Sequence, residues 1–174
     1  ILGMNLRNYI SHERKYVDRR LAQDLTNLGI GAMLHDIGKI DQRPELRRTH
    51  VLDHHEDEEG YRAHTARGFE LLRGRLESTA AGILLHHHQR YDGKGFPEPT
   101  RTHLERHPEP LRGHRIHVFC RIVAVANVLD GMMAACEAKG QPKVAALAAL
   151  QAPEIRKMFD PVIFAAAVRC IPPF

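Results

Sequence analysis

Histidines are the residues in this sequence whose number and spacing point most directly to chemistry. The chain holds 13 His among its 174 residues, and several of them stand beside another His or an Asp. The clearest groups are His35-Asp36, the single His64, and a run of three histidines at 86–88. Imidazole and carboxylate ligands without thiolates are typical of sites for iron, manganese, nickel, cobalt or zinc, and not of structural zinc sites with sulfur ligands. The pattern therefore predicts a metal-binding protein.

Some of these histidines continue apolar helical stripes toward the interior. Positions 25, 28 and 32 share one helical face, and His35 extends it. Positions 76, 80, 83 and 84 form a second stripe that ends at His87, and His88 follows on the adjacent arc. A buried polar side chain costs free energy unless a partner satisfies it. Since neighbouring positions on a helix diverge by about 100°, we expect His87 and His88 to bind different ions and His86 to face the surface or support the site.

Further residues fit a site for a phosphoester. Lys39 would bind phosphate as a point charge, and Gly68, one turn after His64, leaves room for a helix or a metal site to approach. Asn127 interrupts a buried stripe, which a metal ligand and an interhelical hydrogen bond explain equally well. Two ions a few ångströms apart suit phosphoester hydrolysis, because they generate hydroxide at neutral pH and neutralise charge on the phosphoryl group. No Ser or Cys lies in a turn between glycines, so a nucleophilic mechanism has less support.

Helices are expected to position these residues. Helical periodicity dominates residues 14–28, 62–88, 115–136 and 142–170, and no long stretch alternates with a period of two. Residues 118–125 are rich in β-branched side chains, but the apolar pattern continues and favours a buried helix. The fold class predicted is all-α. Two segments, 41–60 and 89–113, read as loops, and the second is rich in Gly and Pro. Because that loop follows directly after three histidines, we expect it to be functional.

Composition narrows the class of protein further. Hydrophobic residues make up 43% and charged residues 26%, as in a single globular domain, which we assign to residues 1–174. The net charge of +4 comes with 6% aromatic residues and no Trp, so we expect no nucleic acid polymer as partner. Unbroken apolar stretches fall short of the roughly 18 residues of a membrane span, and none is expected. Three scattered cysteines favour the cytoplasm. The ends of the sequence suggest a fragment of a longer protein.

Five motifs occur in an order and spacing that resemble one known family. They are His35-Asp36-Ile-Gly-Lys39, His64-Thr-Ala-Arg-Gly68, His87-His88-Gln-Arg-Tyr-Asp92-Gly93-Lys-Gly95-Phe96-Pro97, Arg121-Ile-Val-Ala-Val-Ala-Asn127 and Phe159-Asp160-Pro161. Over about residues 20–170, the chain resembles the HD-GYP domain, a branch of the HD phosphohydrolase superfamily. The resemblance implies an HD-domain helical bundle with a long Gly/Pro-rich loop. It also implies a metal-dependent phosphodiesterase that hydrolyses cyclic di-GMP to pGpG or GMP in bacterial second-messenger signalling.

The resemblance also assigns roles to individual residues. Asp36 and Lys39 would be catalytic, with Asp36 bridging two ions and Lys39 contacting substrate phosphate. The metal ligands would be His35, Asp36, His64, His87, His88 and Asn127. The substrate-binding loop would comprise Asp92, Gly93, Gly95, Phe96 and Pro97. The cofactors implied are two divalent transition-metal ions, with a third left open; iron or manganese is favoured, and nickel, cobalt and zinc remain alternatives. The partners implied are cyclic di-GMP and GGDEF-domain proteins, and a homodimer is left open.

Four departures from the family pattern lead to competing hypotheses. Phe96 replaces the usual Tyr, Gln89 the usual Glu and Asn127 the usual metal-binding Asp, while residues 134–140 contain no arginine. The leading hypothesis is the phosphodiesterase. The second is a catalytically degenerate HD-GYP module that binds nucleotide or a GGDEF-type partner. The third is another HD-superfamily phosphohydrolase. An upstream ligand found in some members cannot be assigned, since His12 and Glu13 lie closer to His35 than that ligand usually does.

Overall fold

The computed structural model describes residues 25–47, 58–98 and 109–170. Their elements, in chain order, are α3 (Leu25–Leu34), the 3-10 turn η1 (Ile37–Asp41), α4 (Pro44–Arg47), α5 (Glu58–Leu72), α6 (Ser78–His86), the 3-10 turn η2 (Gly113–Arg115), α7 (Val118–Ala138), α8 (Val144–Leu150), α9 (Pro153–Arg156) and α10 (Pro161–Cys170). None of the described residues lies in a strand. The prediction of an all-α fold is confirmed.

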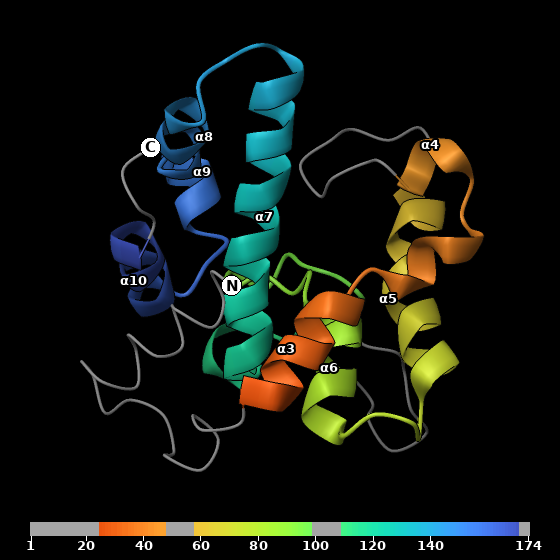
Figure 1. Cartoon of the computed structure of the whole chain (residues 1–174). Coiled ribbons are helices and arrows are strands. Elements are labelled where there is room, and N and C mark those ends of the chain that lie inside the picture. The colour runs from red at the N-terminus through yellow and green to blue at the C-terminus, as the bar shows by residue number, and fades with distance from the viewer. Residues whose placement is uncertain (1–24, 48–57, 99–108, 171–174) are drawn as a thin grey trace.

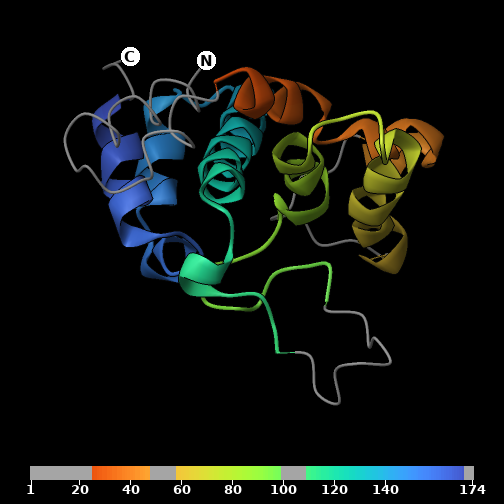
Figure 2. The same cartoon turned by 90° about the horizontal axis from the view of Figure 1, so that it is seen from below.

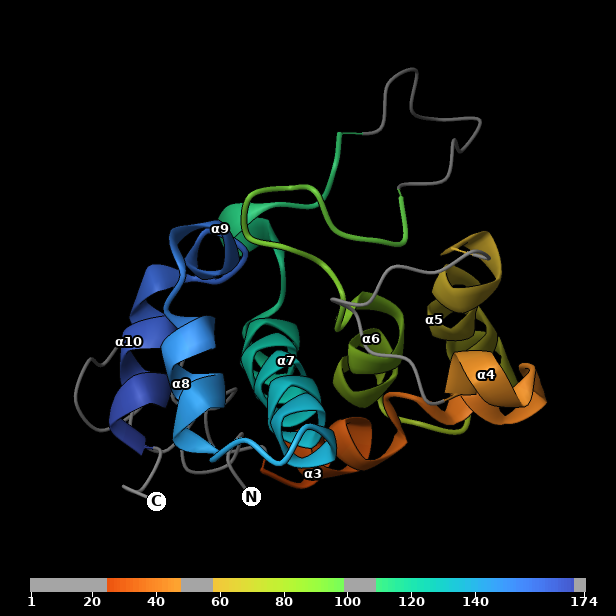
Figure 3. The same cartoon turned by 90° about the horizontal axis from the view of Figure 1, so that it is seen from above.

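Helix α7 is the centre of the main hydrophobic core. Its residues from Val118 to Val125 are all buried, as the sequence predicts for this segment. Helices α8 and α10 pack on α7 from one side and α6 packs on it from the other, an order that Figures 1 and 3 show directly. By length and composition α7 could cross a membrane, but 61% of its apolar window is buried inside the protein. Such burial is typical of a helix in a hydrophobic core.

Helix α6 links this core to the part of the chain that carries the histidines. It packs against α3 and α5 as well as α7, and η1 packs against α5. The last residues of α3, the turn η1, the middle of α5 and the end of α6 therefore come together. Figure 2 shows the green segment that follows α6 leaving that helix and passing beside η2. The predicted loop 89–113 thus begins beside the histidines.

The structure interrupts two helices that the periodicity predicts as continuous. Residues 62–88 form α5 and α6, separated by a turn in which Gly74 has φ +73°, a conformation that favours glycine. Residues 142–170 form α8, α9 and α10, and α9 and α10 each begin at a proline, which cannot continue a preceding helix. The helix predicted over 14–28 is described only from Leu25 onward. The predicted loop 41–60 contains the short α4, and α5 begins within its acidic end.

Candidate metal centre

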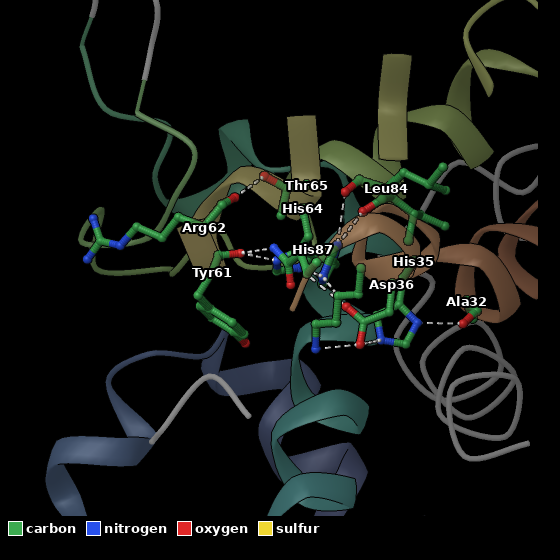
Figure 4. Close-up of polar contacts among 12 residues, drawn as sticks. Ala32, His35, Asp36, Tyr61, Arg62, His64, Thr65, Leu84 and His87 are labelled. Atoms are coloured by element: carbon green, nitrogen blue, oxygen red, sulfur yellow. Dashed lines mark hydrogen bonds and ion pairs between the residues drawn. The ribbon is translucent and has the colours of Figure 1, made fainter. Parts of the chain in front are cut away.

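Four of the predicted site residues gather at one point. Asp36, His64, His87 and His88 each offer one ligand atom, and these atoms lie within 4.8 Å of one another. The three histidines are buried, whereas Asp36 is partly exposed. They come from the segment between α3 and η1, from α5, and from the end of α6, as Figure 4 shows for the labelled members of the set. We call these four residues the candidate metal site.

Hydrogen bonds to the backbone fix which ring nitrogen is available in three of the histidines. Nδ1 of His64 lies 2.5 Å from the Tyr61 carbonyl oxygen. Nδ1 of His87 lies 3.0 Å from the carbonyl oxygen of Ile83, and Nδ1 of His35 lies 2.8 Å from that of Ala32. A carbonyl oxygen only accepts, so each Nδ1 carries the proton and donates it. Each neutral ring therefore presents the lone pair of Nε2, as metal-ligating histidines do.

These lone pairs converge on the Asp36 carboxylate. Its Oδ1 lies 3.3 Å from Nε2 of His64 and 3.7 Å from Nε2 of His87, and the two Nε2 atoms are 3.4 Å apart. Its Oδ2 lies 3.5 Å from Nε2 of His35 and 2.8 Å from Nζ of Lys39. The two carboxylate oxygens thus face different histidines, which is the arrangement that a bridging carboxylate needs.

Buried polar atoms without hydrogen bonds show that the residues present fit a metal cation. Oδ1 of Asp36, Nε2 of His35 and Nε2 of His88 are buried and accept no hydrogen bond from another described residue. Leaving such atoms unsatisfied costs about 1–3 kcal/mol each. A cation among them would satisfy the carboxylate oxygen and the ring lone pairs together. The donor set of imidazole and carboxylate suits a divalent transition metal.

The protonation states also fit. Burial lowers the pKa of His64 to about 4, with the neighbouring His87 as the next cause. Burial likewise lowers the pKa of His87 and that of His88, so the three rings are neutral near pH 7. Burial would raise the pKa of Asp36, but the neighbouring His87, His35 and Lys39 together outweigh that effect and hold the pKa well below its usual range. The site is therefore an anionic carboxylate among neutral imidazoles.

A close approach between two glycines brings Asp36 to His64. A Cβ on Gly38 would collide with the His64 carbonyl oxygen and would lie 2.6 Å from the Gly68 nitrogen, and a Cβ on Gly68 would lie 3.2 Å from the Gly38 nitrogen. Any side chain at Gly38 would therefore push η1 away from α5. The prediction that Gly68 leaves room for a close approach is confirmed.

The loop that follows His88 folds back on this histidine. The Phe96 ring stacks on the His88 ring, with centroids 4.5 Å apart, and the Phe96 N–H donates to the His88 carbonyl oxygen at 3.3 Å. The buried Gln89 donates its side-chain N–H to the Pro97 carbonyl oxygen at 2.6 Å. A Cβ on Gly95 would collide with the backbone of His88 and Arg90. The loop is thus closed tightly, and Phe96 covers one face of His88.

The remaining predicted residues lie at different places relative to the site. His35 lies beside the four residues, its ring centroid 4.9 Å from that of His87. Asp92 binds Arg90 through both carboxylate oxygens, at 3.0 and 2.6 Å, so it shapes the loop. Asn127 is half-buried on α7, and its amide makes no hydrogen bond with another described residue, so its role as a ligand stays a prediction. His86 is half-buried. His12 and Glu13 lie outside the described residues.

Tyr61 is a site residue that the sequence reasoning missed. Its carbonyl orients His64, its ring lies 5.1 Å from the His64 ring, and Nζ of Lys39 lies 5.3 Å from its centroid. Tyr61, Leu46 and Phe96 form a small apolar cluster apart from the main core. The signal that could have found it is its position three residues before a buried histidine on the same helix.

Comparison with known proteins places this arrangement in a family. The model of the HD domain matches residues 13–132. The chain belongs to the HD domain family. Among curated proteins, this HD domain chain is 36% identical over 144 residues to the cyclic di-GMP phosphodiesterase response regulator RpfG of Xanthomonas campestris, covering 80% of the chain and 35% of that protein. It is 31% identical over 112 residues to a cyclic di-GMP phosphodiesterase of Thermotoga maritima, covering 63% of the chain and 27% of that protein.

A solved structure shares the fold of this HD domain. Bd1817, an HD-GYP-type protein of Bdellovibrio bacteriovorus, matches with a TM-score of 0.65 and 18% identity, covering 97% of the chain and 50% of that structure. The predicted resemblance to HD-GYP proteins is confirmed. The chain spans only about a third of the length of the curated relatives.

Proposed function

We propose that this HD domain protein is a metal-dependent phosphodiesterase that hydrolyses cyclic di-GMP to pGpG or GMP in bacterial cytoplasmic signalling. The observation that carries the proposal is the set of lone pairs on His64, His87 and His35, each fixed by its own backbone hydrogen bond, that face one carboxylate. The substrate class is supported by two curated relatives named as cyclic di-GMP phosphodiesterases.

The residues of the site divide the work between them. Divalent ions bound here would supply a hydroxide at neutral pH and neutralise charge on the phosphodiester. Asp36, with one oxygen toward His64 and His87 and the other toward His35, would bridge two ions. The ammonium of Lys39, 2.8 Å from Asp36, would contact a phosphate oxygen as a point charge.

The experiment is cyclic di-GMP turnover by the anaerobically purified protein loaded with Fe(II) or Mn(II), with products separated by chromatography. We expect pGpG or GMP, and none when a chelator is present. Asp36→Asn should lower turnover by more than about 100-fold together with metal content, because it removes the bridging charge. Glu70→Gln, an exposed change on α5, is the matched control and should leave both unchanged. Full turnover by Asp36→Asn would refute the site.

A second candidate function is a degenerate module that binds nucleotide or a GGDEF-type partner without hydrolysis. The observation that favours it is Asn127, an uncharged amide that has no hydrogen bond to another described residue. Binding of cyclic di-GMP without product would support this alternative. If Asn127→Asp then raised metal occupancy and turnover together, the substitution at this position would be the cause of the lost activity.

A further inference from the structure

A second buried polar cluster joins α7 to α10, and it shares no residue with the candidate metal site. Nη1 of Arg121 donates to Oδ2 of Asp160, and both side chains are almost fully buried. The other oxygen of Asp160, Oδ1, accepts the backbone N–H of Val162 at 2.8 Å and that of Ile163 at 3.2 Å. One carboxylate therefore starts α10 and fixes the guanidinium of Arg121. This gives a physical role to the Phe-Asp-Pro motif, which the proposed chemistry does not use.

The cluster extends from Arg121 to the surface. The same Nη1 of Arg121 donates to Nδ1 of His114 at 3.2 Å. Because the Arg121 guanidinium can only donate, Nδ1 of His114 accepts and the ring proton is on Nε2, which lies 3.1 Å from the Tyr91 hydroxyl oxygen and donates to it. The Tyr91 and His114 rings also pack edge to face, with centroids 5.7 Å apart. An unbroken series of polar contacts thus runs from the start of α10 to the loop after α6.

Tyr91 is where this series meets the binding loop. Its backbone N–H donates to the Met158 carbonyl oxygen at 2.8 Å, and its own carbonyl oxygen accepts the Gly113 N–H at 3.0 Å. The backbone of Tyr91 is therefore held between the segment before α10 and the turn η2. The residues that follow, 92–97, close back on His88 through Phe96. Tyr91 thus fixes the start of this loop.

We propose that this second cluster is a positioning network that holds loop 92–97 against His88, so that the loop is in place before substrate binds. Its members, which we call the loop anchor, are Tyr91, His114, Arg121 and Asp160. The proposal rests on the proposed function, since it assigns the anchor a part in substrate binding at that site. The buried ion pair of Arg121 and Asp160 fixes the position of the guanidinium. His114 and Tyr91, bonded in series to that guanidinium, hold the start of the loop in place.

The network acts on binding more than on the chemical step. None of its side chains belongs to the candidate metal site, and the backbone hydrogen bonds that orient His64 and His87 do not involve the loop. A loop that is no longer held must be ordered by the substrate, and that cost appears as weaker binding. Loss of one hydrogen bond of this kind corresponds to a rise in KM of about threefold to tenfold, which should exceed any change in kcat.

The experiment compares Tyr91→Phe and His114→Ala with the wild type, all as the metal-loaded full chain. Tyr91→Phe removes only the hydroxyl group, and His114 has a 61% exposed side chain, so both variants should fold. The matched control is Arg115→Ala, in the same turn as His114, where the exposed arginine pairs with Glu109 at 3.0 Å. Steady-state kinetics with cyclic di-GMP should show the rise in KM for the two anchor variants and not for the control.

Amide hydrogen exchange supplies a readout that does not depend on turnover. The Phe96 N–H, bonded to His88, should exchange faster in both anchor variants, while the amides of α6 exchange as in the wild type. Unchanged exchange at Phe96 would overturn the proposal whether or not the wild type hydrolyses cyclic di-GMP. If the wild type does not hydrolyse cyclic di-GMP but the Phe96 N–H still exchanges faster in the variants than in the wild type, the proposal of the anchor stands and only the proposed function is refuted. An equal change in the Arg115→Ala control would also overturn the proposal.

Discussion

The candidate metal site and the loop anchor are both buried polar clusters, but their polar atoms are satisfied differently. In the anchor, both carboxylate oxygens of Asp160 accept hydrogen bonds, and Nε of Arg121 is the buried side-chain atom left without a partner. In the metal site, Oδ1 of Asp36 lies near Nε2 of His64 and of His87, and neither this oxygen nor Nε2 of His88 has a hydrogen-bond partner among the described residues. A cluster of unsatisfied lone pairs needs a cation, whereas a satisfied ion pair can hold a fold together alone.

The two clusters also differ in the apolar residues that border them. Asp160 and Arg121 border the main core around α7, where Phe159 and Ile122 are also buried. The metal site borders the small cluster that includes Tyr61 and Phe96 as well as the main core, since His87 and His88 line a pocket with Ala124, Val128, Met158 and Phe159. We infer that the anchor contributes stability to the protein without a ligand, while the metal site gains its stability when a metal binds.

Breaking the anchor should produce the largest loss of stability. Asp160→Ala leaves the buried charge of Arg121 without its partner and removes the start of α10, so we expect the free energy of unfolding to fall by about 3–5 kcal/mol. Urea unfolding of the metal-free protein measures it. Asp36→Asn in the metal site is the comparison, and should cost clearly less because Asp36 is 34% exposed.

Equal losses in these two variants would contradict the comparison between the clusters. Asp160→Asn sharpens it. The amide keeps an oxygen for the N–H groups of Val162 and Ile163 but cannot neutralise Arg121. The free energy of unfolding of Asp160→Asn should therefore lie between those of the wild type and Asp160→Ala. An Asp160→Asn protein as stable as the wild type would show that the charge of the pair contributes little.

Alanine substitutions at two glycines with different surroundings test the close approach that shapes the metal site. Gly38→Ala places a Cβ against the backbone of His64. Because backbone cannot move aside easily, we expect the free energy of unfolding to fall by about 1–3 kcal/mol and metal binding to weaken. Gly82→Ala, in α6, meets nothing within 4 Å and should stabilise the helix by up to about 1 kcal/mol. Unfolding and metal content of both variants measure the difference, and normal metal binding by Gly38→Ala would count against the close approach.

Much of the metal site could be predicted because its residues continue apolar stripes. His87 and His35 lie where a helical period places them toward the interior, and their ring centroids are 4.9 Å apart. The all-α fold follows from the same periodicity. The breaks at Gly74 and before α10 were missed, since local apolar spacing continues across them and only the turn residues mark the ends of the helices.

The loop anchor could not be predicted in the same way. Arg121 and Asp160 are 39 positions apart in the sequence, and no periodicity links a helix to a loop. Gln89 is a similar case. From the sequence, Gln89 in place of the usual Glu indicates only that a charge is lost. In the structure its amide donates to the Pro97 carbonyl oxygen, a contact that depends on how the loop closes. Contacts made by chain closure are set by tertiary structure and not by local pattern.

The smallest expected effect lies at the start of α6, outside both clusters. The Glu77 carboxylate accepts the Thr79 N–H at 2.7 Å and the Ser78 hydroxyl at 2.6 Å. These bonds, with that of Ser78 the largest cause, lower the pKa of Glu77 from 4.5 to about 2. Glu77→Gln should therefore cost up to about 1 kcal/mol at pH 7, measured by urea unfolding.

The dependence of this small effect on pH identifies its cause. Because the pKa is lower in the folded state, the unfolded chain takes up the proton first, so the stabilisation is complete above about pH 4.5 and is lost as the pH falls toward 2. The difference between the wild type and Glu77→Gln should narrow steadily below pH 4.5. A difference that stays constant across this range would mean that the side chain acts by its shape rather than its charge. Since His87 and His88 directly follow α6, metal binding by this variant tests whether the stability of the helix start and the binding of the ion are separate.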